Sequence, residues 1–475
     1  MSANIKIGND TLQGVDAVEL ENADALGSYV KFTLGGGGGS VPGGYTVTFV
    51  ANGSNFEVCS IVAGKSVAQP NMPTSEGKYF NGWYTDATGG TEVTFPYTPT
   101  QDTTLYARFS DLIIVGVTGL TNEDGILTLT DGIAGVEAYT TSKEGDYVSV
   151  TNPLSDYFPF NQISEFTDEE GNVFVKYPQL WMKWELDTSG NINGYKFANY
   201  NAGEGYFIPD AFLDPKDTVN DTYLPYFALG KYEMSGSSAK GFSKSGQTCL
   251  VNVTIGDARS AARAYGNAVN VYKGYQQLDF AQYTLYNLMC MMFYNASNIQ
   301  KVYGGRTGRG TVTSWSDASV TGTCDGVTGM NGWNVATDCV KMLGIENPYG
   351  NIAKWCDGVR FSGQAIYTQR YPQRYDSSSG TSLGFNRPSQ NAWVQSLKHG
   401  TVDKTRSYVY ASTVNQYGSY YNDSVYYESS GKCLAVGGNY RQVGSAGLWC
   451  LAGSKDTLTS LSNYGARLSY RPLQV

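Results

Sequence analysis

Histidine is almost absent from this chain of 475 residues: His399 is the single one. A Ser–His–Asp triad or a Cys–His dyad would have to use it, yet it lies in the polar stretch SLKHGTVDK, where we expect a solvent-exposed loop. The stretch GGRTGRGT at 304–311 lacks the GKS or GKT ending of a phosphate-binding Walker loop. We therefore expect no enzyme, no metal site and no cofactor.

Basic charge and long apolar runs are also scarce. There are 33 Lys and Arg against 42 Asp and Glu, a net charge of −9, which argues against a nucleic-acid partner. The richest apolar run, LYNLMCMMFY at 285–294, is half the length that a membrane span needs, so we expect no membrane insertion. The start MSANIKIGND shows no basic segment followed by an apolar run, so we expect no secretory signal.

Paired cysteines are missing as well. The eight cysteines contain no CxxC spacing, and a zinc site would normally need such pairs together with histidine. Without a secretory signal we expect free, mostly buried thiols. Bridges between Cys324 and Cys339 or between Cys433 and Cys450 stay open as alternatives.

Glycine and tyrosine are abundant instead, with 57 and 37 residues, while charged residues make up only 16%. This composition suits a β-rich, loop-rich protein, and tyrosine is favoured at binding surfaces. The glycine run TLGGGGGSVPGG predicts a flexible linker at 35–44. It follows a segment, 1–34, of alternating apolar and polar residues, which we expect to be a β anchor that docks on another subunit.

Three motifs mark residues 45–109: YTVTF at the start, GKYFNGWYTDATGGT in the middle and TLYARF at the end. This stretch resembles the Listeria–Bacteroides repeat, a small β-grasp-like module of bacterial surface proteins. The resemblance implies a spacer or weak adhesion unit. Trp83 and Tyr84 are expected to pack in it rather than to contact a ligand. Residues 110–146 are short strand-like runs and are expected to form a connecting β segment.

From residue 147 onward the sequence predicts aromatic strands, then two helices, then a long stretch rich in glycine and tyrosine. The first helix is expected in 254–268, with Thr254 as its N-cap, and the second in 276–295, where a methionine stripe faces the core. Strands, two helices and an irregular tail are the order of a C-type lectin fold. The fold class is therefore expected to be α+β, with a C-type lectin fold over 147–475.

Four segments resemble one branch of that fold: LGKYEM at 229–234, QLDFAQYTLYNLM at 277–289, NPYGNIAKWCDGV at 347–359, and 447–470. The branch contains formylglycine-generating-enzyme-like proteins and the variable proteins of diversity-generating retroelements. The enzymes hold copper with a cysteine pair, but Cys433 and Cys450 lack that motif context. Classical lectins bind calcium through carboxylates and amides; Asp357 is expected to bond a turn instead.

The resemblance implies that the last part of the chain, about 405–472, is a variable region in which a fixed frame carries exchangeable side chains. The expected frame is Gly437, Gly438, Gly447, Trp449, Gly465, Ala466 and Leu468. The expected ligand-binding residues are Tyr420, Tyr421, Tyr426, Tyr427, Tyr440, Arg441, Gln442, Ser445, Cys450, Ala452, Ser454, Lys455, Asp456 and Tyr464.

The tyrosines in this group offer a large contact area at little cost in rotamer freedom. Packing inside the β loops is the alternative for each of them. If they form a binding face, alanine at Tyr420, Tyr421 or Tyr440 should weaken cell binding and barely change thermal stability.

The function implied is that of a phage receptor-binding protein of the tail-fibre or tail-tip type, with a diversifiable, metal-independent binding face. Its partners would be a glycan or protein receptor on the host cell and, through the N-terminal segment, other virion proteins, and a homo-oligomer is expected. The protein would be a virion component assembled in the host cytoplasm. A structural capsid fibre or decoration protein is the first alternative, and a copper-dependent oxidase is the second.

Overall fold

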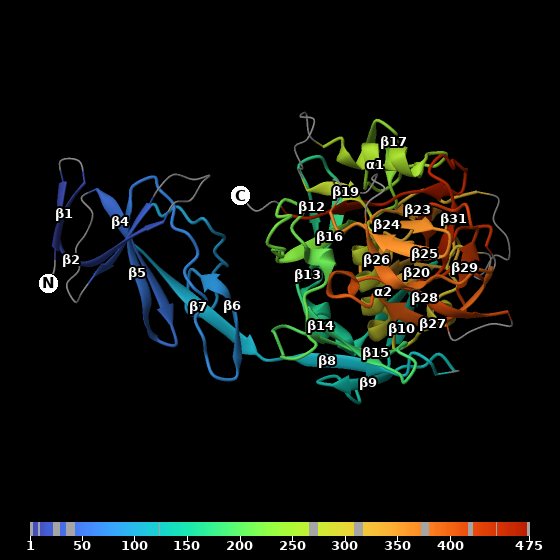
Figure 1. Cartoon of the computed structure of the whole chain (residues 1–475), viewed down its shortest axis with the longest axis horizontal. Helices are drawn as coiled ribbons and strands as arrows, with labels where there is room; N and C mark the ends of the chain where they lie inside the picture. The colour runs from blue at the N-terminus through green and yellow to red at the C-terminus, as the bar shows by residue number, and fades with distance from the viewer. Residues whose placement is uncertain are drawn as a thin grey trace. The chain divides into compact units, whose positions relative to one another are not determined.

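The computed structural model describes residues 3–7, 10–21, 29–34, 43–122, 124–265, 274–307, 317–371, 380–416, 421–442 and 444–472. The contacts within the chain divide it into two compact units, Met1–Leu112 and Ile113–Gln474. In Figure 1 the first unit is blue to cyan and the second runs from cyan to red. Both are built mainly from strands.

The first unit begins with a three-stranded antiparallel sheet in the order β1-β2-β3. These strands are β1 (Ala3–Ile7), β2 (Asp10–Glu21) and β3 (Tyr29–Leu34). They lie within the segment expected as a β anchor, whose docking partner stays a prediction.

The rest of the first unit is a four-stranded sheet in the order β5-β4-β7-β6, in which β4 and β7 run parallel. Its strands are β4 (Gly44–Ala51), β5 (Ser54–Val62), β6 (Lys78–Tyr84) and β7 (Thr103–Asp111). Asn52 and Gly53 join β4 to β5, both with positive φ, +52° and +75°. A two-residue hairpin turn of this hand requires such backbone angles, which Asn-Gly adopts readily.

Trp83 is the centre of the core of this module. Its ring is buried and lies 4.8 Å from that of Phe49 in an edge-to-face arrangement. Tyr84 points to the other side of the sheet, half-buried, with the Arg108 guanidinium 4.2 Å from its ring. The prediction that both residues serve packing is confirmed for Trp83, and Tyr84 makes the expected cross-strand contact.

The second unit starts with a sheet that joins distant segments, in the order β14-β15-β8-β9. Its strands are β8 (Ile114–Thr118), β9 (Thr128–Asp131), β14 (Trp181–Leu186) and β15 (Ile192–Ala198). β8 pairs antiparallel with β15. Residues 114–131, which the sequence suggested as part of a connecting segment, are therefore an integral part of the second unit.

The second unit also contains a five-stranded sheet in the order β12-β13-β16-β33-β19. Its strands are β12 (Ser164–Thr167), β13 (Val173–Pro178), β16 (Tyr226–Gly230), β19 (Tyr275–Gln277) and β33 (Leu468–Tyr470). β33 lies between β16 and β19 and runs antiparallel to both. The end of the described chain is thus an inner strand.

The largest sheet has seven strands in the order β28-β27-β29-β31-β30-β23-β32. Its strands are β23 (Ala353–Cys356), β27 (Ala392–His399), β28 (Val409–Asn415), β29 (Ser424–Tyr427), β30 (Cys433–Val436), β31 (Leu451–Lys455) and β32 (Tyr464–Gly465). The pairs β29·β31 and β23·β32 are parallel. Most of the predicted variable region, 405–472, belongs to this sheet and its connections.

Three further sheets, with five, two and three strands, complete the second unit: β10-β11-β20-β21-β22, β17-β18 and β24-β25-β26. Their strands are β10 (Thr140–Glu144), β11 (Tyr147–Thr151), β17 (Ser235–Ser237), β18 (Lys240–Phe242), β20 (Gly332–Asn334), β21 (Cys339–Met342), β22 (Ile345–Glu346), β24 (Val359–Ser362), β25 (Ala365–Thr368) and β26 (Thr381–Asn386).

Both predicted α-helices are present. α1 (Ile255–Arg263) begins at a capping box formed by Thr254 and Asp257, as the N-cap prediction required. α2 (Phe280–Tyr294) begins after Asp279, whose side chain caps it. It therefore starts later than predicted, because residues 275–277 form β19.

Every side chain of α2 is buried, not only the predicted methionine stripe. A helix without a polar face suits the interior of a domain, and Figure 1 shows α2 among the strands of the second unit. Hydroxyl groups tie it in place: Tyr195 donates to the carbonyl of Leu288 at 2.6 Å, and Tyr286 donates to that of Met342 at 2.8 Å. No helix in the described part of the chain has the length and apolar character to cross a membrane.

Two expectations from the sequence are settled here. All eight cysteines are free and buried, as predicted, so neither bridge that was left open forms. The expectation of a solvent-exposed loop at His399 is wrong, because this residue ends β27 and its ring stacks on that of Trp184 at 5.4 Å. Burial lowers the pKa of His399, and its Nδ1 lies 2.7 Å from the carbonyl oxygen of Gly400.

Candidate functional site

The segment 437–450, here called the display loop, connects β30 to β31 and is held in place through its main chain. Two side chains of α2 donate hydrogen bonds to the carbonyl oxygen of Leu448: Asn287 Nδ2, at 2.6 Å, and the Tyr283 hydroxyl. Gln300 Nε2 donates to the carbonyl of Ala446. The main-chain N–H of Trp449 donates to Asp423 Oδ2 at 2.7 Å.

The other end of the display loop rests on the segment that precedes β23. The N–H of Gly350 donates to the carbonyl of Gly437 at 2.9 Å, and the N–H of Tyr440 donates to the carbonyl of Asn351 at 2.9 Å. These contacts involve main-chain groups, which every residue type shares, so they do not depend on the side chains of Gly437 and Tyr440. Between them the loop is also braced from within, because the N–H of Asn439 donates to Gln442 Oε1 at 2.9 Å and the N–H of Arg441 donates to Asn439 Oδ1 at 3.0 Å.

Glycines in the expected frame have a steric reason to be glycine. A Cβ at Gly447 would lie 1.8 Å from Asp423 Oδ1, and one at Gly437 would lie 2.9 Å from the carbonyl oxygen of Pro348 at a φ of +81°. Trp449 is fully buried, with its Nε1 3.0 Å from Met291 Sδ. These residues fix the loop against α2 and β23.

Five of the predicted ligand-binding residues are buried, with at most 6% of each exposed: Tyr421, Tyr440, Cys450, Ala452 and Tyr464. Their assignment to an exposed face was wrong. Tyr421 belongs to the apolar cluster around α2, and the Tyr464 ring packs 5.1 Å from that of Trp355. These residues are part of the frame, because the apolar space beneath the loop and the sheet has to be filled.

The other predicted residues reach the surface to different degrees. Arg441 and Asp456 are exposed, and Tyr426, Tyr427, Gln442, Ser445, Ser454 and Lys455 are half-buried. Tyr420 lies outside the described residues. Whether the accessible residues bind a ligand stays a prediction.

Tyr426 and Tyr427 do not share a face, since neighbouring residues of a strand point to opposite sides. The Tyr427 ring lies 4.7 Å from the Arg387 guanidinium. The Tyr426 hydroxyl instead lies 2.9 Å from Ser445 Oγ. Burial raises the pKa of Tyr426, and hydrogen bonds with Ser445 and Gln442 oppose this rise. Tyr426, Gln442 and Ser445 therefore meet at one place.

Two cations lie beside two of the buried tyrosines. The Arg441 guanidinium is 5.2 Å from the ring of Tyr440, and Lys455 Nζ is 5.8 Å from the ring of Tyr464. Such distances allow a cation–π attraction. We use the term display surface for five accessible residues of the predicted set: Tyr426, Arg441, Gln442, Ser445 and Lys455.

Sequence reasoning did not find the residues that hold the display loop. Asp423, Asn287 and Gln300 are buried polar side chains, and their only sequence signal is a polar residue inside an apolar or aromatic run. Asn351 did carry a signal, because it belongs to the NPYGN motif.

Metal ligation receives no support from the described residues. They contain no group of three or more His, Cys, Asp or Glu side chains placed to hold a metal ion. Asp357 was expected to bond a turn, but its carboxylate accepts hydrogen bonds from Arg259 of α1 at 2.6 and 3.0 Å.

Known proteins resemble the chain in two separate ways. Residues 45–108 match the family described as the Listeria-Bacteroides repeat domain, which confirms the predicted resemblance. Internalin H of Listeria monocytogenes serovar 1/2a is 38% identical over 86 residues, which are 18% of this chain and only 15% of Internalin H.

Two solved structures are similar over a longer stretch. The Major Tropism Determinant M1 variant shares 13% identity over 79% of this chain and 77% of its own, and the U1 variant shares 13% over 74% and 82%. Both give a TM-score of 0.25, which is too low to assign a fold. The family likeness is thus confined to residues 45–108, and the second unit must be interpreted from its own geometry.

Proposed function

We propose that residues 113–474 form a C-type lectin fold that presents a metal-independent binding surface, and that the protein is a phage receptor-binding protein. The arrangement of the second unit supports the fold proposal. Two helices precede the long irregular part of the chain, and β33 returns to pair with β16 and β19. Because β33 pairs with two strands that come much earlier in the chain, the long segment between β19 and β33 is held at both ends.

The main-chain support of the display loop is the observation that carries the binding proposal. Side chains from outside the loop fix its carbonyl and N–H groups, while Arg441 and Ser445 point to positions that solvent reaches. Substitutions at such positions change the surface chemistry without changing the path of the backbone. A protein whose receptor changes needs contact residues that can be exchanged while the residues that fix the backbone stay the same.

The chemistry of the display surface suits either a glycan or a protein receptor. Tyr426 offers an aromatic face, Gln442 and Ser445 offer polar groups, and Arg441 and Lys455 add positive charge to a chain whose net charge is −9. Aromatic residues with arginine are the residue types that dominate binding energy at interfaces.

The remaining parts of the proposal rest on the sequence resemblance. The N-terminal segment would attach the protein to other virion proteins, the repeat module would act as a spacer, and the chain would assemble as a homo-oligomer on the virion.

Binding to whole bacterial cells tests the proposal. Fluorescently labelled full-length protein is incubated with a panel of bacterial strains, and binding is compared with that of the variant Arg441→Ser/Ser445→Ala. We expect the wild type to bind some strains, and the double variant to lose at least about tenfold in affinity, since interface hot spots contribute about 1–3 kcal/mol each. Melting temperatures should agree. Equal binding of both proteins, or binding to no strain, would contradict the proposal.

A structural capsid fibre or decoration protein is the second candidate. The burial of five predicted contact residues favours it, because fewer variable positions reach a ligand. Sequences of sister isolates separate the two: substitutions concentrated on the display surface support binding, and uniform drift supports a structural role.

We also propose that the protein is not an oxidase. Burial raises the pKa of Cys433 to about 12 and raises that of Cys450 as well, whereas copper binding needs the thiolate form. Metal analysis of the purified protein, together with an assay of peptide-thiol oxidation in air, tests this. Stoichiometric copper with turnover would contradict it.

A further inference from the structure

Glu233 and Lys354 form an ion pair sealed inside the second unit. Lys354 Nζ lies 2.9 Å from Glu233 Oε1, and the side chains are 1% and 0% exposed. Lys354 is part of β23, and Glu233 lies between β16 and β17. Burial lowers the pKa of Lys354, because surroundings of low polarity disfavour its ammonium form. The neutral amine, which is a nucleophile, is therefore easier to form here than in water.

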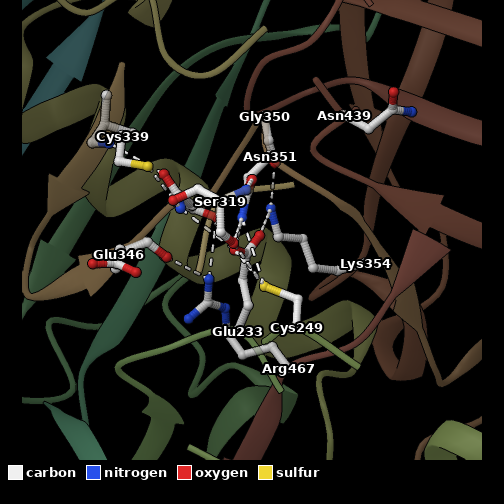
Figure 2. A network of polar contacts seen from close by, with 12 residues as sticks. Glu233, Cys249, Ser319, Cys339, Glu346, Gly350, Asn351, Lys354, Asn439 and Arg467 are labelled. Carbon is white, nitrogen blue, oxygen red and sulfur yellow. Dashed lines mark hydrogen bonds and ion pairs between the residues drawn. The ribbon is translucent and has the colours of Figure 1, made fainter. Parts of the chain in front are cut away.

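The side-chain amide of Asn351 occupies the other oxygen of the same carboxylate. Asn351 Nδ2 donates to Glu233 Oε2, and Asn351 Oδ1 accepts the main-chain N–H of Ser319 at 2.7 Å. Figure 2 shows the Lys354 amine and the Asn351 amide directed at the Glu233 carboxylate. The amide oxygen thus has a donor where negative charge would develop during nucleophilic addition, and the amide nitrogen contacts an acid–base group.

We propose that Lys354 and Asn351 form an intramolecular amide crosslink with Glu233 as the acid–base catalyst. Lys354 Nζ adds to Asn351 Cγ, so that an Nζ–Cγ bond forms and the Cγ–Nδ2 bond breaks. In the ion pair, Glu233 first takes one proton from the Lys354 ammonium at Oε1, which leaves the neutral amine that adds to Cγ. A second Nζ proton passes through the Glu233 carboxyl group to Nδ2, ammonia leaves, and Glu233 stays protonated. An amine and a primary amide become a secondary amide and ammonia, without an oxidant, a metal or another reactant.

The crosslink would act on the base of the display loop. Asn351 and Gly350 hold the main chain at Tyr440 and Gly437, and Lys354 lies at the end of the same short segment. Closing this segment into a ring fixes the backbone there and removes a buried pair of charges, which is costly to keep in an apolar interior. The proposal does not depend on what the display surface binds.

Mass spectrometry of the full-length protein tests the crosslink. Loss of ammonia lowers the intact mass by about 17 Da. Trypsin does not cut after an acylated lysine, so Lys354 should stay uncut and peptide 342–360 should appear with the lower mass. Fragment ions must locate the crosslink at Asn351. Asn347, whose Nδ2 lies 3.4 Å from Glu233 Oε2, is in the same peptide, and a crosslink there would overturn the assignment.

Variants separate the proposed roles. Lys354→Arg and Glu233→Gln should both show the full mass expected for their sequences, the first because it lacks the nucleophile and the second because it lacks the acid–base group. Lys341→Arg is the matched control. Lys341 is also buried, and its Nζ donates to the carbonyl of Val327 at 2.7 Å; this variant should keep the lower mass.

Two results would overturn the proposal. The first is wild-type protein of full mass that trypsin cuts after Lys354, which would leave a buried ion pair and nothing more. The second is a lower mass with normal cleavage after Lys354, because a succinimide at Asn351 loses ammonia without involving the lysine. If the Glu233 variant does not fold, the wild-type peptide still decides between these results.

Discussion

Asp423 lies directly beneath the display loop and accepts the main-chain N–H of Trp449 through Oδ2 at 2.7 Å. Its carboxylate also receives Gln300 Nε2 at 3.1 Å, and it is buried. The segment around Asp423 and the display loop both look like surface loops in the sequence. One carboxylate joins them. This carboxylate is one of the groups that hold the main chain of the display loop near Trp449.

Replacing Asp423 should loosen the loop. We expect Asp423→Ala to lower the free energy of unfolding by about 1–3 kcal/mol, because the Trp449 N–H and the Gln300 amide lose a buried acceptor. Chemical denaturation followed by tryptophan fluorescence measures this. Asp156→Ala, at an exposed position, is the control and should change stability by no more than about 0.5 kcal/mol. Equal effects of the two substitutions would show that the carboxylate does not hold the loop.

Gly447 should not tolerate a side chain. A Cβ would lie 1.8 Å from Asp423 Oδ1, so Gly447→Ala must displace the loop or the carboxylate, at a cost of about 1–3 kcal/mol. Gly256→Ala in α1 is the matched control, since its added Cβ would come no closer than 3.7 Å to Thr254 Oγ1. Alanine in a helix should raise stability by up to about 1 kcal/mol there. Melting temperatures that change in the same direction for both variants would contradict this prediction.

The buried tyrosines should behave as core residues. Tyr421→Ala and Tyr464→Ala should each lower the free energy of unfolding by about 3–5 kcal/mol, as removal of a buried aromatic ring does. Arg441→Ala, at an exposed position, should change it by no more than about 0.5 kcal/mol. This reverses the expectation from the sequence that alanine at Tyr421 or Tyr440 leaves stability unchanged. Melting temperatures of the two tyrosine variants equal to that of the wild type would contradict their role as core residues.

Glu346 should make stability depend on pH. Burial raises its pKa to about 7, although the N–H groups of Cys324 and Gly322 bond its carboxylate. The ordinary pKa of a glutamate carboxyl in the unfolded chain is about 4.5. Between the two values the folded protein therefore holds a proton that the unfolded chain releases. Its contribution to stability is fully present below the lower value and is lost as the pH rises through the higher one.

The measurement is the free energy of unfolding between pH 4 and 8 for the wild type and Glu346→Gln. The variant should lack the part of the decline that falls between about pH 4.5 and 7. Glu137→Gln removes a negative charge at an exposed position and should follow the wild-type profile. A variant profile parallel to that of the wild type would contradict the assignment.

Local signals in the sequence were sufficient for several elements. The start of α1 follows from Thr254, whose side chain caps the helix whatever surrounds it. The repeat module follows from its strand motifs and from Asn52-Gly53, a pair that favours a tight hairpin. In these places nearby residues determine the structure, so the pattern is visible in a short window.

The candidate site depends on contacts across the chain, and there the sequence was less informative. Tyr421 and Tyr426 have the same side chain and similar neighbours, yet only Tyr421 is in the core. Tyr421 belongs to the large apolar cluster that includes α2, a helix more than a hundred residues earlier, whereas Tyr426 packs partly buried against a smaller cluster. The ion pair of Glu233 and Lys354 likewise joins residues from distant segments. Both residues lie in segments that carry the resemblance, LGKYEM and NPYGNIAKWCDGV, but neither segment indicates that the two side chains pair.

The position of β33 has a consequence for how the protein is made. Because this strand lies between β16 and β19, a ribosome must have released residues 468–470 before the sheet can close, by which time the whole display loop has already emerged. Pairing over such a long separation is slow and leaves the earlier strands waiting with open edges. Synthesis that stops before residue 468 therefore leaves the facing edges of β16 and β19 without their shared partner strand.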